Sequence, residues 1–137
     1  MPGQAVRQAA AIPLRNGRVG LVTSTGGKRW VVPKGMIDPG HTAAEAALIE
    51  AWEEAGFIGT VSTEPIGTYN YKKYDRTYHV TVFVMQVTDV ENDWPERFRR
   101  REWLSVETAC LRIREPGLRE LIREAAVRAE ELASTHH

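Results

Sequence analysis

Hydrophobic and polar positions alternate along the first hundred residues in a way that predicts short strands. The stretches 5–15 and 18–24 are rich in Ala, Val and Leu, and Asn16-Gly17 between them is typical of a two-residue hairpin turn. The stretch 76–88 carries apolar residues at consecutive positions, which favours a strand buried on both of its faces. These three segments predict the centre of a β-sheet.

Three further stretches have weaker strand patterns. Residues 30–35 form a short apolar run that ends in Pro-Lys-Gly, and Asp38-Pro39-Gly40 follows as a turn. Residues 58–71 are less regular and predict either one bent strand or two. Residues 99–104 predict another strand. The sheet is therefore expected to have several members beyond its centre.

The stretch 42–55 has the composition and end signals of a helix. It is rich in alanine, a strong helix former. Thr42 stands three residues before Glu45, which is the spacing of a capping box. Gly56 follows as a natural left-handed stop. A helix from Thr42 to Ala55 is predicted.

Two more helices are predicted near the C-terminus. Ser105 can cap a short helix over 106–112, and Pro116 can open a final amphipathic helix. The apolar stripe of that last helix is Leu118, Leu121, Ile122, Ala125 and Leu132. Residues 134–137 are expected to form a frayed tail. Strands and helices in this order predict the α/β class, with a mixed sheet packed between helices.

Length and charge limit the classes of protein. A chain of 137 residues predicts a single domain over 1–137. The 18 basic and 18 acidic residues give a net charge of +0, so nothing favours bulk attraction to nucleic acid or membranes. Cys110 is the one cysteine, which excludes an internal disulfide, and it is interpreted as a packing residue. With no apolar run of transmembrane length and no basic segment at the N-terminus, a cytoplasmic location is expected.

The predicted helix 42–55 carries an unusual cluster of acids. Glu50, Glu53 and Glu54 fall within one and a half turns, so their carboxylates are neighbours and repel each other. They also lie near the helix C-terminus, where the macrodipole disfavours each anion by roughly 0.3–1 kcal/mol. A hard divalent cation such as Mg²⁺ or Mn²⁺ would relieve this repulsion. The alternative is a solvated acidic helix face.

The residues around this cluster match a known pattern. Gly35, then Glu50, Glu53, Glu54 and Gly56-Phe57 have the order and spacing of the Nudix box, so the chain resembles the Nudix hydrolase family. The resemblance implies an α/β/α sandwich and metal ions held by the glutamates and the carbonyl of Gly35. It also implies a substrate that contains a diphosphate linked to another group.

Two positions depart from that box. His41 stands where the family has its first glutamate, and Ile49 stands where the family has an arginine beside the acidic cluster. An isoleucine leaves more negative charge uncompensated, which favours greater dependence on metal. His41 is interpreted as a surface residue rather than a ligand. The three helix glutamates and the glycine are retained.

The basic residues form groups that could bind phosphates. Arginine forks match phosphate geometry, and lysine supplies a point charge. The candidates for substrate binding are Arg7, Arg29, Lys34 and Arg76, and a further run comprises Arg97, Arg99, Arg100 and Arg101. The alternative for each is charge at hairpin tips and strand edges. Trp30 and Trp94 could stack on a base, although packing is the commoner role for tryptophan.

Short matches outside the box extend the resemblance to one branch of the family. They include Asp93-Trp94 and Arg101-Glu102-Trp103, and they are similar to the diphosphoinositol polyphosphate phosphohydrolases. That branch implies a highly phosphorylated small substrate. Dinucleoside polyphosphates are the first expectation and diphosphoinositol polyphosphates the second. The oligomeric state, monomer or homodimer, stays open.

The expected chemistry is metal-assisted hydrolysis of a phosphoanhydride bond. Glu50, Glu54 and the Gly35 carbonyl are expected to hold Mg²⁺ or Mn²⁺, and Glu53 is expected to act as general base. Lys34 or nearby arginines would stabilise charge on the leaving phosphate. Spacing does not decide which of Glu53 and Glu54 is the base.

Two alternatives belong to other functional classes. His41 and Ile49 are compatible with a Nudix-fold protein that binds a nucleotide and regulates without cleaving it. The arginines at 97–101 are compatible with an RNA 5′-end pyrophosphohydrolase, although the neutral net charge weighs against a nucleic-acid substrate.

Overall fold

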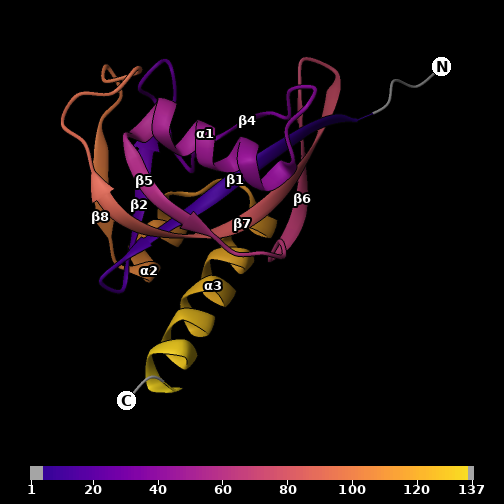
Figure 1. Ribbon diagram of the computed structural model, residues 1–137. Coiled ribbons are helices and arrows are strands. Elements are labelled where there is room, and N and C mark those ends of the chain that lie inside the picture. Colours follow the sequence, from indigo (N-terminus) through magenta and orange to yellow (C-terminus); the bar gives the residue numbers. More distant parts are fainter. Residues whose placement is uncertain (1–4, 136–137) are drawn as a thin grey trace.

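The computed structural model describes the backbone of residues 5–135 and the side chains of residues 5–131, and within them it contains one mixed sheet and three helices (Figure 1). The strands are β1 (Val6–Arg15), β2 (Arg18–Thr23), β3 (Trp30–Val31), β4 (Lys34–Met36), β5 (Phe57–Val61), β6 (Gly67–Lys73), β7 (Arg76–Val90) and β8 (Arg101–Leu104). The helices are α1 (Ala43–Ala55), α2 (Val106–Arg112) and α3 (Pro116–Thr135).

β1 and β7 form the centre of the sheet. They pair in parallel from Val6 opposite Tyr78 to Leu14 opposite Gln86. β2 and β4 pair antiparallel with β1, β5 and β6 pair antiparallel with β7, and β3 and β8 pair with β2. The hairpin predicted at Asn16-Gly17 is confirmed, since both residues have positive φ.

The sheet separates two apolar clusters, so the predicted α/β sandwich is confirmed (Figure 1). The alanines of α1 pack on one face, together with Phe83 and Met85 of β7. α2 and α3 cover the other face, where Val80 and Val82 of the same strand are buried. β7 is therefore buried on both faces along its middle, as its unbroken apolar run predicts.

Both predicted ends of α1 are confirmed. The amide of Thr42 donates to Glu45 Oε1 over 2.8 Å, and the amide of Glu45 donates to Thr42 Oγ1 over 3.1 Å, which completes the capping box. Gly56 ends the helix in the left-handed conformation, with φ of 68°. Local hydrogen bonds and backbone preferences thus fix the residues at which the acidic helix begins and ends.

The prediction of one strand over 30–35 is wrong in detail. Two short strands occur, because Pro33 has no N–H to donate to a ladder. β3 pairs with β2, whereas β4 crosses to pair with β1. The carbonyl of Pro33 still accepts from the amide of Ala11 over 3.1 Å, so the chain stays attached to β1 between the two strands.

Of the two alternatives for the segment 58–71, the structure contains two strands, β5 and β6, rather than one bent strand. Two other boundaries differ from the sequence pattern. The strand expected from residue 99 begins only at Arg101, because the amide of Arg99 donates to the carbonyl of Glu96 in a turn, over 3.0 Å. α3 continues to Thr135, within the stretch expected to be a frayed tail, and its distal half projects beyond the sheet (Figure 1). Leu132 and residues 136 and 137 lie outside the described side chains.

None of the helices in the described part of the chain has both the length and the apolarity that a membrane span requires.

Candidate active site

The candidate site contains a close approach between Gly35 and the side chain of Glu50. β4 runs beside β1, with Gly35 opposite Ala9, and this places Gly35 under α1. A Cβ added at position 35 would collide with the carboxyl group of Glu50. Glycine lets the Glu50 carboxyl lie directly against β4, because any other side chain at position 35 would displace this carboxyl.

Glu54 lies one turn further along α1 and is 7% exposed. Its Oε1 accepts from the backbone amide of Lys34 over 3.4 Å. The carboxyl groups of Glu50 and Glu54 lie within hydrogen-bonding distance of each other. We call these two residues the acid pair. α1 and the β3–β4 connection therefore build one small acidic centre from residues about twenty positions apart.

Burial dominates the protonation of the acid pair. It raises the pKa of Glu54 to about 8, and contact with Glu50 adds to that rise. The charge of Arg99 and the amide of Lys34 act in the opposite direction on the same pKa. Burial also raises the pKa of Glu50, to which the charge of Glu53 contributes. A buried pair of this kind needs either a shared proton or a cation.

The acid pair has the donor chemistry of a site for a hard divalent cation. Two carboxylates in contact beside a side-chain-free glycine offer oxygen ligands and room, which suits Mg²⁺ or Mn²⁺. Among the described side chains, no three or more His, Cys, Asp or Glu residues lie close enough together to hold a metal ion by themselves. Backbone, water or substrate oxygens would complete the coordination shell, as is usual for Mg²⁺.

Glu53 lies apart from the acid pair. Its side chain is half-buried, and its backbone carbonyl accepts from the amide of Glu96 over 2.9 Å. Its negative charge reaches Glu50 and contributes to the raised pKa of that residue. The three glutamates are thus neighbours on α1 without forming a three-carboxylate cluster, and the role of Glu53 as base stays a prediction.

A cavity of about 640 Å³ opens beside Glu54. Five cationic side chains line it, and we call it the basic cavity. They are Lys28, Arg29, Lys34, Lys73 and Arg99. Of Glu50, Glu53 and Glu54, only Glu54 is part of the lining, and Glu115 is the second acid there. Cationic walls next to a metal-type acid pair favour a polyanionic ligand.

Lys34 is the cation at the inner end of the basic cavity. Its ammonium lies 5.3 Å from the ring centroid of Tyr71, whose hydroxyl donates to Gln8 Oε1 over 2.7 Å. Burial lowers the pKa of Lys34, and the charge of Glu54 opposes that shift. The backbone amide of Lys34 binds Glu54, so a single residue joins the acid pair to the cationic wall.

Arg99 is held rigidly in the same wall. Its side chain is 9% exposed and bonds Glu96 Oε1 through Nε and Nη2, over 2.9 and 2.7 Å. Its Nη1 donates to the carbonyl of Thr23 over 2.9 Å. Arg99 brings positive charge to the acidic helix, which carries Ile49 instead of an arginine. Sequence analysis grouped Arg99 with its neighbours and did not single it out, because its partner Thr23 is 76 residues away.

The structure separates the other basic candidates. Arg29 lines the basic cavity and pairs with Glu115 over 3.0 Å. Arg7 and Arg76 are exposed and are not part of the lining, so their role in substrate binding stays a prediction. Arg97 pairs with Asp93 over 2.7 Å, and Arg101 turns toward the end of α1.

Lys73 and Tyr71 also line the basic cavity. They lie on β6, which pairs along its whole length with β7. The two tryptophans considered as base-stacking residues have packing positions instead. Trp94 is buried, and Trp30 packs against the core beneath Arg100.

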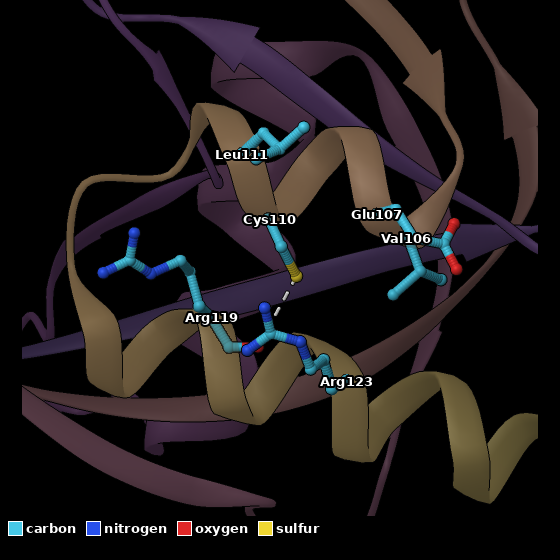
Figure 2. A pocket seen from close by; sticks show the side chains of 6 residues that line it. All are labelled: Val106, Glu107, Cys110, Leu111, Arg119 and Arg123. Atoms are coloured by element: carbon cyan, nitrogen blue, oxygen red, sulfur yellow. Dashed lines mark hydrogen bonds between the residues drawn. The ribbon is translucent and has the colours of Figure 1, made fainter.

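A second cavity, of about 440 Å³, lies between α2 and α3 (Figure 2). The Cys110 thiol at its base donates to the carbonyl of Arg119 over 3.7 Å. Burial raises the pKa of Cys110, so it stays a thiol, and its interpretation as a packing residue is confirmed. This cavity is on the face of the sheet that α1 does not cover.

The chain is similar in sequence to known proteins. Residues 5–126 match the NUDIX domain. Over 84 residues the chain is 36% identical to diphosphoinositol polyphosphate phosphohydrolase 3-beta of Bos taurus, and 34% identical to diphosphoinositol polyphosphate phosphohydrolase 2 of Mus musculus. The alignments cover 59% of this chain and 50% and 45% of those proteins. The chain thus matches about half the length of these relatives.

Solved structures with the same fold include two from distant organisms. The C. elegans Ap4A hydrolase superposes with a TM-score of 0.76 at 20% identity, over 92% of this chain and 99% of that one. The E. coli ORF135 protein superposes with a TM-score of 0.66 at 22% identity, over 98% and 96% of the two chains. At these identities the likeness concerns the fold.

Proposed function

Because the chain belongs to the NUDIX family, we propose that it is a metal-dependent pyrophosphohydrolase acting on a polyphosphorylated small molecule. One observation carries the proposal: Glu54 of the acid pair lines the same cavity as five cationic side chains. A metal-binding acid beside a cationic wall matches a substrate that has a diphosphate and additional phosphates.

Glu50, Glu54 and the carbonyl of Gly35 are the groups that hold Mg²⁺ or Mn²⁺ in this proposal. The ion, when bound, neutralises the diphosphate and lowers the pKa of a water molecule. The chain itself supplies two neighbouring carboxyl groups whose pKa values are raised by burial, so that their ionised forms repel each other without a cation. Bound metal relieves this repulsion. The backbone amide of Lys34 orients Glu54 toward the cavity.

Glu53 acts as general base in the proposed reaction. It accepts a proton from water while the water oxygen bonds to one phosphorus of the diphosphate. The bond from that phosphorus to the bridging oxygen breaks, and the leaving phosphate keeps its electron pair. Lys34 stabilises the charge that develops on the leaving group. The products are two phosphate-bearing molecules with the elements of water added.

The lining of the basic cavity favours a substrate with several negative charges. Arg29 is already paired with Glu115 and Arg99 with Glu96. Three cations, Lys28, Lys34 and Lys73, then remain for phosphate oxygens beyond those that the metal neutralises. Dinucleoside polyphosphates are the first choice of substrate and diphosphoinositol polyphosphates the second.

A substrate panel tests the proposal. Purified protein is incubated with diadenosine tetraphosphate, a diphosphoinositol polyphosphate and a nucleoside-diphosphate sugar, each with Mg²⁺ or Mn²⁺, and products are separated by anion exchange. We expect cleavage of at least one of the first two, and loss of that cleavage with EDTA and in Glu54→Gln.

Other outcomes of the panel select the alternatives. Tight binding of diadenosine tetraphosphate without product would identify a Nudix-fold binding protein. Faster release of pyrophosphate from 5′-triphosphorylated RNA than from any small substrate would identify an RNA 5′-end pyrophosphohydrolase.

A further inference from the structure

The segment 91–101, between β7 and β8, lies against the C-terminal end of α1. The last four carbonyls of an α-helix lack partners within the helix. Here each has one. The carbonyl of Trp52 accepts from the amide of Gly56, and the carbonyl of Glu53 accepts from the amide of Glu96, each over 2.9 Å. The carbonyl of Glu54 accepts from Nε1 of Trp94 over 3.0 Å. The carbonyl of Ala55 accepts from Nη1 of Arg101 over 2.8 Å.

Trp94 and Arg101 supply two of these donors and form one unit, which we call the helix clamp. The Arg101 guanidinium lies 3.9 Å from the Trp94 ring centroid. Trp94 is 9% exposed, and Arg101 also donates to the carbonyl of Glu91 over 2.6 Å. Arg101 opens β8 opposite Val22 of β2. The clamp is therefore anchored in the sheet.

The charge of Arg101 suits its position. The C-terminal end of a helix carries partial negative charge, which cations stabilise and anions oppose. α1 has no basic residue in its last turn, and it carries Glu53 and Glu54 there. Arg101 thus brings, from a distant strand, the positive charge that the helix itself lacks.

Gly56 lets the clamp approach the helix end. A Cβ at position 56 would lie 3.0 Å from Cβ of Trp94 and 3.1 Å from Nη1 of Arg101. The glycine that ends α1 therefore has a second role besides its φ of 68°, because its missing side chain leaves room for both clamp residues.

We propose that Trp94 and Arg101 are positioning residues that hold the last turn of α1, and with it Glu53 and Glu54, in the geometry of the metal site. The inference rests on the function proposed above. Helix ends fray when their carbonyls lack partners. Fraying would move Glu54 away from the Lys34 amide, and a misplacement of about 1 Å can cost on the order of a hundredfold in rate.

The test compares Trp94→Phe with Trp103→Phe. Trp94→Phe removes the indole N–H that donates to the carbonyl of Glu54, and it keeps an aromatic ring beneath Arg101. The second makes the same chemical change at a half-buried tryptophan that packs on Phe57, next to Gly56, with a centroid distance of 5.0 Å, but that donates to none of the last four carbonyls of α1. Trp103→Phe is therefore the matched control for lost size.

Two measurements do not depend on turnover. Amide hydrogen exchange in the metal-free protein reports fraying at Ala55 and Gly56. Calorimetric titration with Mn²⁺ alone reports the affinity of the acid pair. We expect Trp94→Phe to exchange at least about tenfold faster at these amides and to bind Mn²⁺ about tenfold more weakly, whereas Trp103→Phe matches the wild type in both.

Arg101 provides an independent pair of variants. Arg101→Met removes the charge and both carbonyl contacts, and Arg101→Lys keeps a cation at the helix end. We expect Mn²⁺ affinity in the order wild type, Arg101→Lys, Arg101→Met. Equal affinities in the two variants would overturn the role of the charge.

The outcomes separate this inference from the proposed function. Equal exchange and equal Mn²⁺ affinity in Trp94→Phe, Trp103→Phe and wild type would overturn the clamp, while hydrolysis by the wild type would keep the function. A wild type that binds Mn²⁺ and hydrolyses nothing in the panel would overturn the function and leave the clamp supported by the exchange and affinity differences. No Mn²⁺ uptake by the wild type would overturn both.

Discussion

Glu50 and Glu54 stand one turn apart on α1 with their carboxyl groups within hydrogen-bonding distance of each other. Two ionised carboxylates this close repel, and burial of Glu54 strengthens that repulsion. A proton or a divalent cation between them removes it. The stability of the protein and its uptake of metal are therefore both expected to depend on the ionisation of this pair.

Without metal, we expect wild-type stability to fall relative to Glu54→Gln as pH rises. The folded-state pKa of Glu54 is about 8, and that of an unfolded glutamate is about 4.3. Between these values the folded state binds more protons than the unfolded state, so the free energy of unfolding decreases with pH. The stabilisation of the folded state by the proton on Glu54 is fully present below about pH 4.3 and is lost above about pH 8.

Urea unfolding in EDTA across this pH interval measures the difference between the two proteins. Glutamine has no such titration, so the comparison measures the titration of Glu54 together with its effect on the neighbouring Glu50. A gap between the two midpoints that stays constant with pH would contradict the prediction.

Glu53→Gln is expected to cut turnover at least about a hundredfold and to retain most of the metal affinity. The reason is that Glu53 lies outside the acid pair, so its loss removes the base without removing a ligand. Steady-state kinetics and Mn²⁺ calorimetry measure the two properties. Glu54→Gln is the contrast and should lose both. Unchanged turnover in Glu53→Gln would discard Glu53 as the base.

Gly35→Ala is expected to weaken Mn²⁺ binding with only a small change in the free energy of unfolding, because the group that must move is the far end of a flexible side chain. The new methyl group would occupy the space of the Glu50 carboxyl and displace it. Gly26→Ala is the matched control, because a Cβ at position 26 meets no atom within 4 Å. Calorimetry and thermal unfolding of both variants measure the effect. Equal Mn²⁺ affinity in the two variants would show that position 35 does not set the place of Glu50.

Lys34→Gln is expected to lower kcat/KM for diadenosine tetraphosphate by about tenfold or more, which corresponds to roughly 1.4 kcal/mol of lost transition-state stabilisation. Lys34 lines the basic cavity next to Glu54, whereas Lys72 is exposed and is not part of the lining. Lys72→Gln makes the same change in net charge and should have little effect. Similar losses in both variants would mean that overall charge, rather than the cavity, attracts the substrate.

Short-range features of this protein could be read from the sequence. The capping box of Thr42 and Glu45 and the stop at Gly56 involve residues at most a few positions apart. The hairpin at Asn16-Gly17 depends on two adjacent residues. These features form through local hydrogen bonds and backbone preferences, and the structure contains them as predicted.

The split of the segment 30–35 could not be read in the same way. Its apolar run predicts a strand, but Pro33 makes the two halves pair with different neighbours, β2 and β1. Which neighbour a short strand meets depends on the packing of the whole sheet, so local pattern alone is insufficient.

The sequence by itself determined the acidic helix, its ends and the spacing of Glu50, Glu53 and Glu54, because helical periodicity places residues three and four apart side by side. Only the tertiary structure decided which cations face the acids. Arg99 binds Thr23 and Arg29 binds Glu115 across 76 and 86 residues, while Arg101, two positions from Arg99, turns to the end of α1. Such long-range contacts follow from strand register, and a shift of one residue would reverse the face on which each side chain lies.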